Sequence, residues 1–202
     1  MGFDLWRFES QAHRMGRRRV AGIDEAGRGP LAGPVVSAAV ILPDRVDLPG
    51  IDDSKRLTPA RRDRLYDRLY QVARSIGIGV VDAAEIDRVN ILQATLRAMA
   101  MAVDNLQPRP DHLLIDGLFT IAWDLPQEVI VHGDSLSISI AAASIVAKVT
   151  RDRIMSQVDC LFPEFDFGRH KGYPTRAHRA AIMQHGCSPL HRRTFKGVRE
   201  YL

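Results

Sequence analysis

The chain has little cysteine, little lysine and no long apolar run, and each shortage narrows its possible functions. Two cysteines, Cys160 and Cys187, have no metal-ligand spacing and form no disulfide framework, so we expect buried free thiols. The seven histidines lack the i, i+4 spacing of a helical zinc site, which argues against zinc chemistry.

Signals for membranes and secretion are missing as well. No run of about eighteen apolar residues occurs, and residues 1–11 include Asp4, Arg7 and Glu9 where a signal peptide needs an apolar core. We therefore expect a cytoplasmic protein with no membrane partner. Its 202 residues, 46% hydrophobic and 26% charged, fit one globular domain. Length alone leaves two small domains open, but no linker or internal repeat favours them.

Positive charge is concentrated late in the chain. The net charge is only +4, yet residues 160–202 hold eight Lys or Arg against three Asp or Glu, and four of the seven histidines. Arginine outnumbers lysine 24 to 4, which suits bidentate phosphate contacts and fits equally well a bias in genome base composition. A pI near 9.4 with a basic tail favours a nucleic-acid partner over a small metabolite.

The most informative stretch is 23–34, IDEAGRGPLAGP, at the end of an apolar run. A hairpin between predicted strands 19–25 and 35–42 explains its glycines and prolines. It does not explain Asp24 and Glu25, which alternation places on opposite faces of a strand, so that one points toward the core. Such a carboxylate usually has an arginine or a metal ion as its partner.

The glycines of this stretch also suggest contact with phosphates. Their spacing matches neither the P-loop nor the dinucleotide-binding fingerprint. Two carboxylates would repel a bare phosphate unless divalent cations lay between them. The consistent hypothesis is therefore carboxylates, metal and phosphodiester in series, with backbone N–H groups of the loop close to the sugar-phosphate chain.

Two more carboxylates follow buried strands. Strand 112–115 closes on Asp116 and strand 128–132 closes on Gly133 and Asp134. One such aspartate is most often a turn or cap residue. Together with Asp24 and Glu25, however, they place four carboxylates at three strand ends, where the sites of α/β proteins gather. If all four converge, their repulsion requires cations.

Other elements follow from periodicity and caps. A third strand is predicted at 76–81, where Gly77 and Gly79 leave one face bare. Helices are predicted at 3–15, from Thr58 and Pro59, at 82–87, from Asn90, over 135–158, and from Thr175 to Gly186. Within the long helix, Lys148 and Asp152 are spaced to form an ion pair.

The motifs IDEAGRGPLAGPV, DSKRL, NILQAT, LLIDG, HGDSLSISIAAASIVAKVTRD, HKGYPT and HRRTF follow one another over residues 18–198. This series resembles the type 2 ribonucleases H, the ribonuclease HII family. The resemblance implies the ribonuclease H-like fold, an α/β fold whose mixed sheet has antiparallel and then parallel strands, flanked by helices. It divides a single catalytic domain, 1–202, into a core, 1–158, and a helical extension that contacts substrate, 159–202.

The resemblance also implies an activity. Ribonucleases of this family degrade RNA in RNA–DNA hybrids and nick duplex DNA on the 5′ side of an embedded ribonucleotide, leaving a 3′-hydroxyl and a 5′-phosphate. The implied partners are therefore RNA–DNA hybrid and DNA duplex containing ribonucleotides, with roles in ribonucleotide excision repair and DNA replication. We expect a monomer. The sequence leaves open the preferred substrate and any protein partner such as a sliding clamp.

By matching motif, the implied metal ligands and catalytic residues are Asp24, Glu25, Asp116 and Asp134. They would hold two Mn²⁺ or Mg²⁺ ions with substrate bound, and an all-oxygen set suits these hard cations.

The implied substrate-binding residues lie in five of these motifs. Gly27, Arg28 and Gly29 match the loop that recognises the ribose 2′-hydroxyl through backbone groups, and Tyr173 matches the tyrosine that packs on the sugar at the DNA junction. Weaker matches, as backbone-phosphate contacts, are Lys55, Lys148 and Arg192. His132 departs from the pattern because many relatives have lysine there, which leaves a positive charge near Asp134 in doubt.

Two other hypotheses remain. A nucleic-acid-binding module that kept the fold and lost catalysis would have lost one of the four carboxylates, and all four are present. A junction-resolving nuclease would also cluster carboxylates but would not need the 2′-hydroxyl loop or Tyr173.

Overall fold

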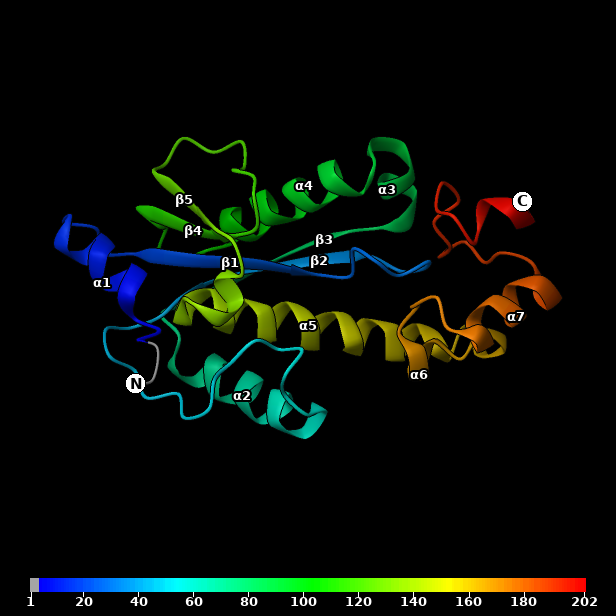
Figure 1. The fold of residues 1–202 in the computed structure, drawn as a ribbon, viewed down its shortest axis with the longest axis horizontal. Coiled ribbons are helices and arrows are strands. Elements are labelled where there is room, and N and C mark those ends of the chain that lie inside the picture. Colours follow the sequence, from blue (N-terminus) through cyan, green and yellow to red (C-terminus); the bar gives the residue numbers. More distant parts are fainter. Residues whose placement is uncertain (1–3) are drawn as a thin grey trace.

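The computed structural model of the chain describes residues 4–202, and its centre is one five-stranded mixed sheet (Figure 1). The order across the sheet is β3-β2-β1-β4-β5. The strands are β1 (Val20–Ala26), β2 (Val35–Ile41), β3 (Ser75–Val81), β4 (His112–Asp116) and β5 (Gln127–Ile130). β1, β2 and β3 pair antiparallel, while β4 pairs parallel with β1 and with β5. The predicted change from antiparallel to parallel strands is confirmed.

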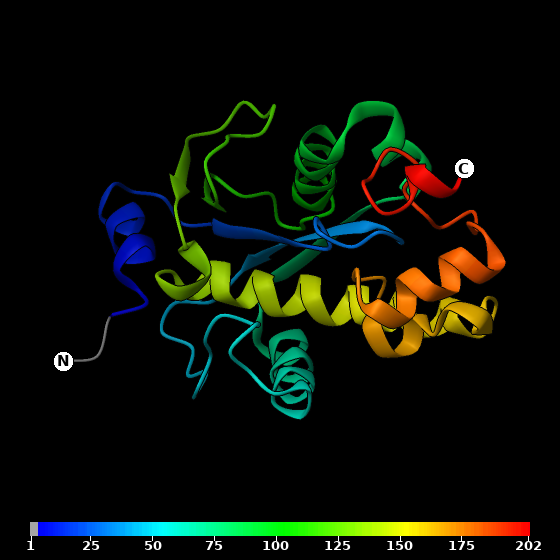
Figure 2. The same cartoon turned by 45° about the vertical axis from the view of Figure 1, so that its right-hand side comes forward.

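Helices cover both faces of the sheet. The helices are α1 (Arg7–Arg14), α2 (Pro59–Val72), α3 (Ala83–Val89), α4 (Ile91–Asp104), α5 (Ile138–Asp159), α6 (Phe167–His170) and α7 (Arg176–His185). Figure 2 shows α4 on one face and α5 on the other, with α2 packed outside α5. α6 and α7 lie together beyond one end of the sheet (Figures 1 and 2). None of the helices within 4–202 is long and apolar enough to cross a membrane.

Local sequence explains where several helices begin. The Thr58 side chain accepts a hydrogen bond from the Arg61 N–H, and Pro59 occupies the first helical position of α2. Thr175 caps α7 in the same way through the His178 N–H. Gly186, at φ +77, ends that helix. The predictions of these caps are confirmed.

Three predictions of the elements need correction. The strand predicted at 128–132 ends at Ile130, because His132 has φ 58 and residues Gly133–Ser135 form the 3₁₀ turn η1. The long helix predicted from 135 begins after Ser137, whose side chain caps it. The short helix predicted at 3–15 spans Arg7–Arg14, and Phe3 lies outside the described residues.

The two cysteines are free, as predicted, but they are not buried. Cys160 is exposed and Cys187 is half-buried. Both lie after α5, outside the main layers, where the chain turns over the surface. The prediction of burial was wrong because it rested on residue type alone.

Glycines let the backbones of the layers approach closely. A Cβ at Gly22 of β1 would lie 2.2 Å from the Ser139 carbonyl carbon of α5. On the other face, the strand side left bare by Gly79 is filled by α4, where an added Cβ would lie 1.9 Å from the Ala98 oxygen. α5 is therefore held directly against β1, the strand that carries Asp24.

We expect Gly22→Ala to lower the free energy of unfolding by about 3 kcal/mol, because the methyl group collides with backbone that cannot move aside. Urea unfolding checks this. Gly168→Ala is the matched control: its methyl group meets only the side chain of Asp159, which can rotate. Equal stability of the two variants would show that the β1–α5 contact is looser than the structure indicates.

Candidate active site

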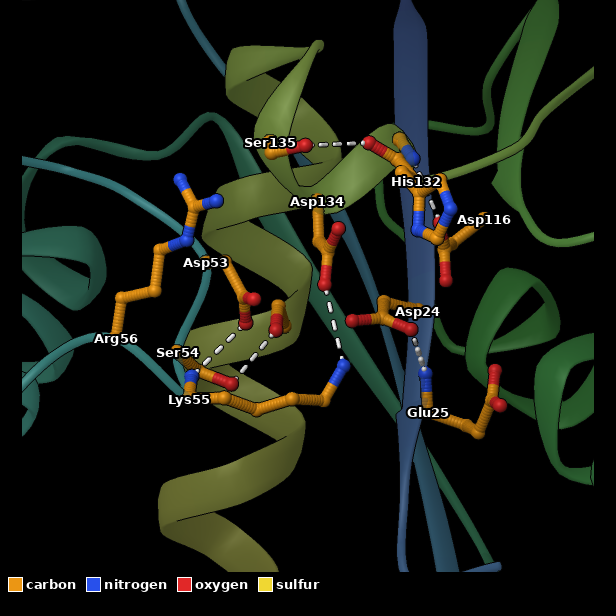
Figure 3. A network of polar contacts seen from close by, with 12 residues as sticks. Asp24, Glu25, Asp53, Ser54, Lys55, Arg56, Asp116, His132, Asp134 and Ser135 are labelled. Carbon is orange, nitrogen blue, oxygen red and sulfur yellow. Dashed lines mark hydrogen bonds and ion pairs between the residues drawn. The ribbon is translucent and has the colours of Figure 1, made fainter.

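Two neighbouring parallel strands and one turn bring three carboxylates together. β1 and β4 pair with Ile23 opposite Ile115, so Asp24 and Asp116 follow side by side at the same edge of the sheet. Turn η1, just before α5, adds Asp134. One carboxylate oxygen from each of the three residues lies within 4.8 Å of the others. Figure 3 shows the three side chains converging beside the first turn of α5.

Each carboxylate is held in its place. One oxygen of Asp24 accepts the Glu25 N–H at 2.7 Å, and Asp116 accepts the Gly133 N–H at 2.7 Å, which ties the end of β4 to turn η1. Asp134 accepts from Lys55 Nζ at 3.2 Å. These contacts fix the carboxylates while leaving other oxygen lone pairs free.

The electrostatics of the group favour a cation. Burial raises the pKa of Asp24 well above its usual value, and the charges of Glu25 and Asp116 raise it further. The pKa of Asp116 is raised by burial and then by Asp134. Burial acts to lower the pKa of Lys55, but Asp134 and Asp53 outweigh it and raise that pKa. The carboxylates are thus poorly solvated and repel one another, and one ammonium group already offsets them in part.

Glu25 does not join the three converging carboxylates. Its side chain points away from that of Asp24 (Figure 3) and pairs with Arg28 Nη1 at 3.2 Å. Burial raises the pKa of Glu25, and Arg28 opposes the shift. Alternation along β1 explains the divergence, because neighbouring side chains of a strand leave on opposite faces.

A pocket of about 250 Å³ opens beside the carboxylates. Most of the site residues predicted from the sequence line this pocket. Its lining is Asp24, Glu25, Ala26, Gly27, Arg28, Gly29, Ser54, Lys55, Asp116, Ser144, Lys148 and Tyr173. Asp134 faces an adjoining hollow, which it shares with Lys55 and His132.

Lys148 forms the ion pair that its helical spacing predicted and also lies in the pocket. Its ammonium group pairs with Asp152 at 2.7 Å, as the helical spacing predicted. It also lines the pocket and lies 5.8 Å from the centre of the Tyr173 ring.

The expected place of Arg192 is corrected. Its side chain is fully buried, and its guanidinium donates to the carbonyl oxygens of Gly27, Arg28 and Gly33. A phosphate contact requires an exposed guanidinium, so Arg192 supports the glycine-rich loop from beneath and does not lie at the substrate surface.

The sequence analysis missed a buried chain of histidines behind Tyr173. His191 Nδ1 accepts the Ser188 N–H at 2.9 Å, so the proton of its neutral ring is on Nε2, which lies 3.0 Å from His178 Nε2. His178 then donates from Nδ1 to the Tyr173 carbonyl oxygen at 3.0 Å. Burial lowers the pKa of each histidine to about 4, which keeps both rings neutral near pH 7. Only the clustering of histidines in 160–202 hinted at this network.

Ser144 and Arg151 were also missed. The Ser144 hydroxyl donates to the Ser54 hydroxyl at 2.8 Å, and Ser144 lines the pocket together with Asp24. Arg151 is buried and donates to three backbone carbonyls near the loop. Both lie on α5 among small residues that predicted only close packing.

This sheet order, with carboxylates at the ends of β1 and β4 and at the turn before α5, defines the ribonuclease H-like class of enzymes. A family model described as Ribonuclease HII matches residues 21–198. The ribonuclease HII of Geobacter sulfurreducens is 60% identical over 98% of this chain and 91% of its own length. That of Geobacter metallireducens is 58% identical over 98% and 93%. The chain therefore belongs to the ribonuclease HII family: it is a hydrolase, an endonuclease of the ribonuclease H type.

Solved structures agree with this assignment. Ribonuclease H2 from Pyrococcus horikoshii aligns with a TM-score of 0.74 at 26% identity, over 91% of this chain and 97% of that one. Ribonuclease HII from Archaeoglobus fulgidus, solved in complex with PCNA, aligns with a TM-score of 0.76 at 27% identity, over 89% and 96%. A ribonuclease HIII solved with Mn²⁺, 21% identical with a TM-score of 0.67, shares the fold.

The three converging residues fit a divalent metal. All their donor atoms are carboxylate oxygens, which suit hard cations. Burial and neighbouring carboxylates raise the pKa values of Asp24 and Asp116, which indicates negative charge without enough compensation. This cluster can hold a metal ion.

We expect Asp24→Asn to raise the stability of the metal-free protein by about 1 to 2 kcal/mol, because it removes a buried charge that its neighbours repel. Asn can still accept the Glu25 N–H. Thermal melting in EDTA and in Mn²⁺ checks this, since Mn²⁺ is expected to stabilise the unchanged protein and the control but not Asp24→Asn. Asp63→Asn, which changes an exposed carboxylate near Arg153, is the control. Equal stabilisation of Asp24→Asn by Mn²⁺ would contradict the assignment.

Proposed function

We propose that this enzyme is a metal-dependent endonuclease that degrades RNA in RNA–DNA hybrids. On duplex DNA it nicks on the 5′ side of an embedded ribonucleotide and leaves a 3′-hydroxyl and a 5′-phosphate. The observation that carries the proposal is the pocket in which Asp24, Asp116, the glycine-rich loop and Tyr173 meet, with Asp134 beside it completing the cluster of three carboxylates.

The metal ligands in this proposal are Asp24, Asp116 and Asp134, with Glu25 as the fourth. Glu25 needs a rotation of its side chain away from Arg28. Mn²⁺ or Mg²⁺, as two ions when substrate is bound, would activate the attacking water and stabilise the leaving 3′-oxygen. Lys55, now paired with Asp134, would exchange that carboxylate for a substrate phosphate.

Recognition of the ribose is assigned to the space between Gly29 and Tyr173. Gly29 does not have a positive φ, and a Cβ placed there would meet only the Tyr173 ring, at 3.9 Å. The protein itself therefore gives no packing reason for glycine at this position. A ribose in that space would meet the backbone of Gly27, Arg28 and Gly29 on one side and an aromatic face on the other.

The extension 159–202 contributes Tyr173 to this pocket and carries most of the excess positive charge. We propose that it contacts the substrate duplex, within one catalytic domain over 1–202. Lys55 and Lys148 line the pocket and remain the proposed phosphate contacts. These substrates imply roles in ribonucleotide excision repair and DNA replication. The proposal keeps the cytoplasmic location expected from the sequence.

We expect an end-labelled DNA duplex with one ribonucleotide to be nicked directly 5′ of that nucleotide in Mn²⁺ or Mg²⁺ and not in EDTA. Gel mapping at nucleotide resolution gives the position. Asp24→Asn is expected to lose nearly all turnover while it still binds the duplex, because it removes metal-binding charge and leaves the phosphate contacts. If long hybrids are cleaved but no nick forms at the single ribonucleotide, the assignment of the acidic residues as the catalytic site would stand. The assignment of ribose recognition to the loop would then be wrong.

We expect Gly29→Ala to keep its free energy of unfolding within about 0.5 kcal/mol, since the methyl group makes only an ordinary contact with the Tyr173 ring. Its cleavage at a single ribonucleotide is expected to fall by about 100-fold, because the methyl group fills the place proposed for the sugar. Parallel urea unfolding and single-turnover kinetics separate the two effects. Unchanged cleavage would place the ribose elsewhere.

A further inference from the structure

Arg151 and Arg192 have the largest fully buried side chains among the described residues. A buried guanidinium usually pairs with a carboxylate. Within 4–202 neither arginine forms an ion pair. Their donors are instead directed to backbone carbonyl oxygens of the glycine-rich loop and of the segment before Tyr173.

Arg192 binds both ends of the glycine-rich loop. Its Nη2 donates to Gly27 O at 2.6 Å and Nη1 donates to Arg28 O at 2.9 Å. At the other end of the loop, Nε and Nη2 reach Gly33 O at 3.0 and 2.9 Å. One rigid planar group therefore sets the direction of two consecutive peptide carbonyls and closes the loop on itself.

Arg151 joins the loop to the Tyr173 segment. It donates to Pro34 O at 2.9 Å and to Ala32 O at 3.1 Å. A third bond, at 3.0 Å, goes to the oxygen of Lys171, two residues before Tyr173. Its guanidinium thus helps to set the separation between the loop and the tyrosine.

Gly27 is required by this arrangement. It has φ +99, and a Cβ there would lie 2.1 Å from Arg151 Nε. Gly27 therefore has a packing role that Gly29 lacks: it lets the loop lie directly on the buried guanidinium.

The direction of the carbonyls determines that of the amides. The peptides after Gly27 and Arg28 are trans, since the one cis bond within the described chain is Gln107-Pro108. In a trans peptide the C=O and the following N–H point in opposite directions. With the carbonyls drawn inward by Arg192, the N–H groups of Arg28 and Gly29 point away from it, on the side of the pocket. Within 4–202 neither N–H has an acceptor.

The tail that carries Arg192 is itself anchored. The Asp87 carboxylate of α3 accepts the N–H groups of Arg193 and Thr194 at 2.7 and 2.9 Å. Burial, and then the charge of Arg151, lowers the pKa of Arg192 to about 9, so that its guanidinium remains charged at neutral pH. Burying two positive charges close together is energetically unfavourable. The hydrogen bonds from the guanidiniums to the loop carbonyls offset part of that cost.

We propose that Arg192 and Arg151 are positioning residues for ribonucleotide recognition: Arg192 directs the Arg28 and Gly29 amides at the ribose 2′-oxygen, and Arg151 sets the distance from that loop to Tyr173. The inference rests on the proposed function, since it takes the ribose as the ligand of the loop. Neither arginine touches substrate.

Binding to two duplexes that differ by one 2′-hydroxyl tests the proposal. Fluorescence anisotropy in Ca²⁺ would give the affinities of the unchanged protein, Arg192→Lys and Arg151→Lys. We expect each variant to lose about tenfold of its preference for the ribonucleotide duplex, the effect of misdirecting one ordinary hydrogen bond, and to keep its affinity for all-DNA duplex. Arg193→Lys, an exposed neighbour, is the matched control and should keep the preference.

The outcomes separate the two proposals. A parallel loss of affinity for both duplexes, or a preference left intact in folded variants, would overturn the positioning role. No preference in the unchanged protein would instead reject the proposed function and the inference with it.

If both variants fail to fold, amide NMR of the unchanged protein decides. The Arg28 and Gly29 signals should shift with the ribonucleotide duplex and not with the all-DNA duplex. Equal shifts with both duplexes would overturn the proposal.

Discussion

The mutual repulsion of Asp24, Asp116 and Asp134 is the constraint on which the rest of the structure depends. Carboxylates held this close tend to separate or to take up protons. The parallel pairing of β1 and β4 fixes the first two, and the Gly133 N–H bound to Asp116 fixes the turn that carries the third. Close contact between β1 and α5 at Gly22 keeps these elements from moving apart. Strand pairing and the β1–α5 contact thus keep the three carboxylates close enough together to bind a cation.

The other wall of the pocket is organised by charge of the opposite sign. Beneath the glycine-rich loop lie two buried guanidiniums, and their hydrogen bonds go to backbone carbonyls. The loop consequently presents N–H groups toward the pocket while its carbonyls face the protein. One wall therefore attracts cations and the other offers hydrogen-bond donors. A phosphodiester lying between them would meet compatible groups on both sides.

Local patterns predicted the sheet and the edge where the carboxylates gather, because strand ends and caps are set by neighbouring residues. Predictions that depended on contacts between residues far apart in the sequence were less successful. Arg192 was expected at a phosphate because an arginine in a basic tail is usually exposed. Its burial depends on Gly27 and Gly33, which lie far away in sequence. Glu25 was grouped with the metal ligands by motif, yet strand alternation, which the sequence also shows, directs it toward Arg28.

Comparison of the glycines shows which of them are required by packing within the protein and which are not. At Gly22 and Gly27 an added Cβ would collide with α5 backbone or with Arg151, so the fold itself requires glycine. At Gly29 it would meet open space with Tyr173 beyond, and the backbone there is unstrained. A glycine without an internal reason, beside the carboxylates and an exposed aromatic ring, fits the proposal that a ribose comes close to its backbone. Sequence alone does not separate Gly27 from Gly29 within the motif, whereas the structure shows that the fold requires glycine at the first position and not at the second.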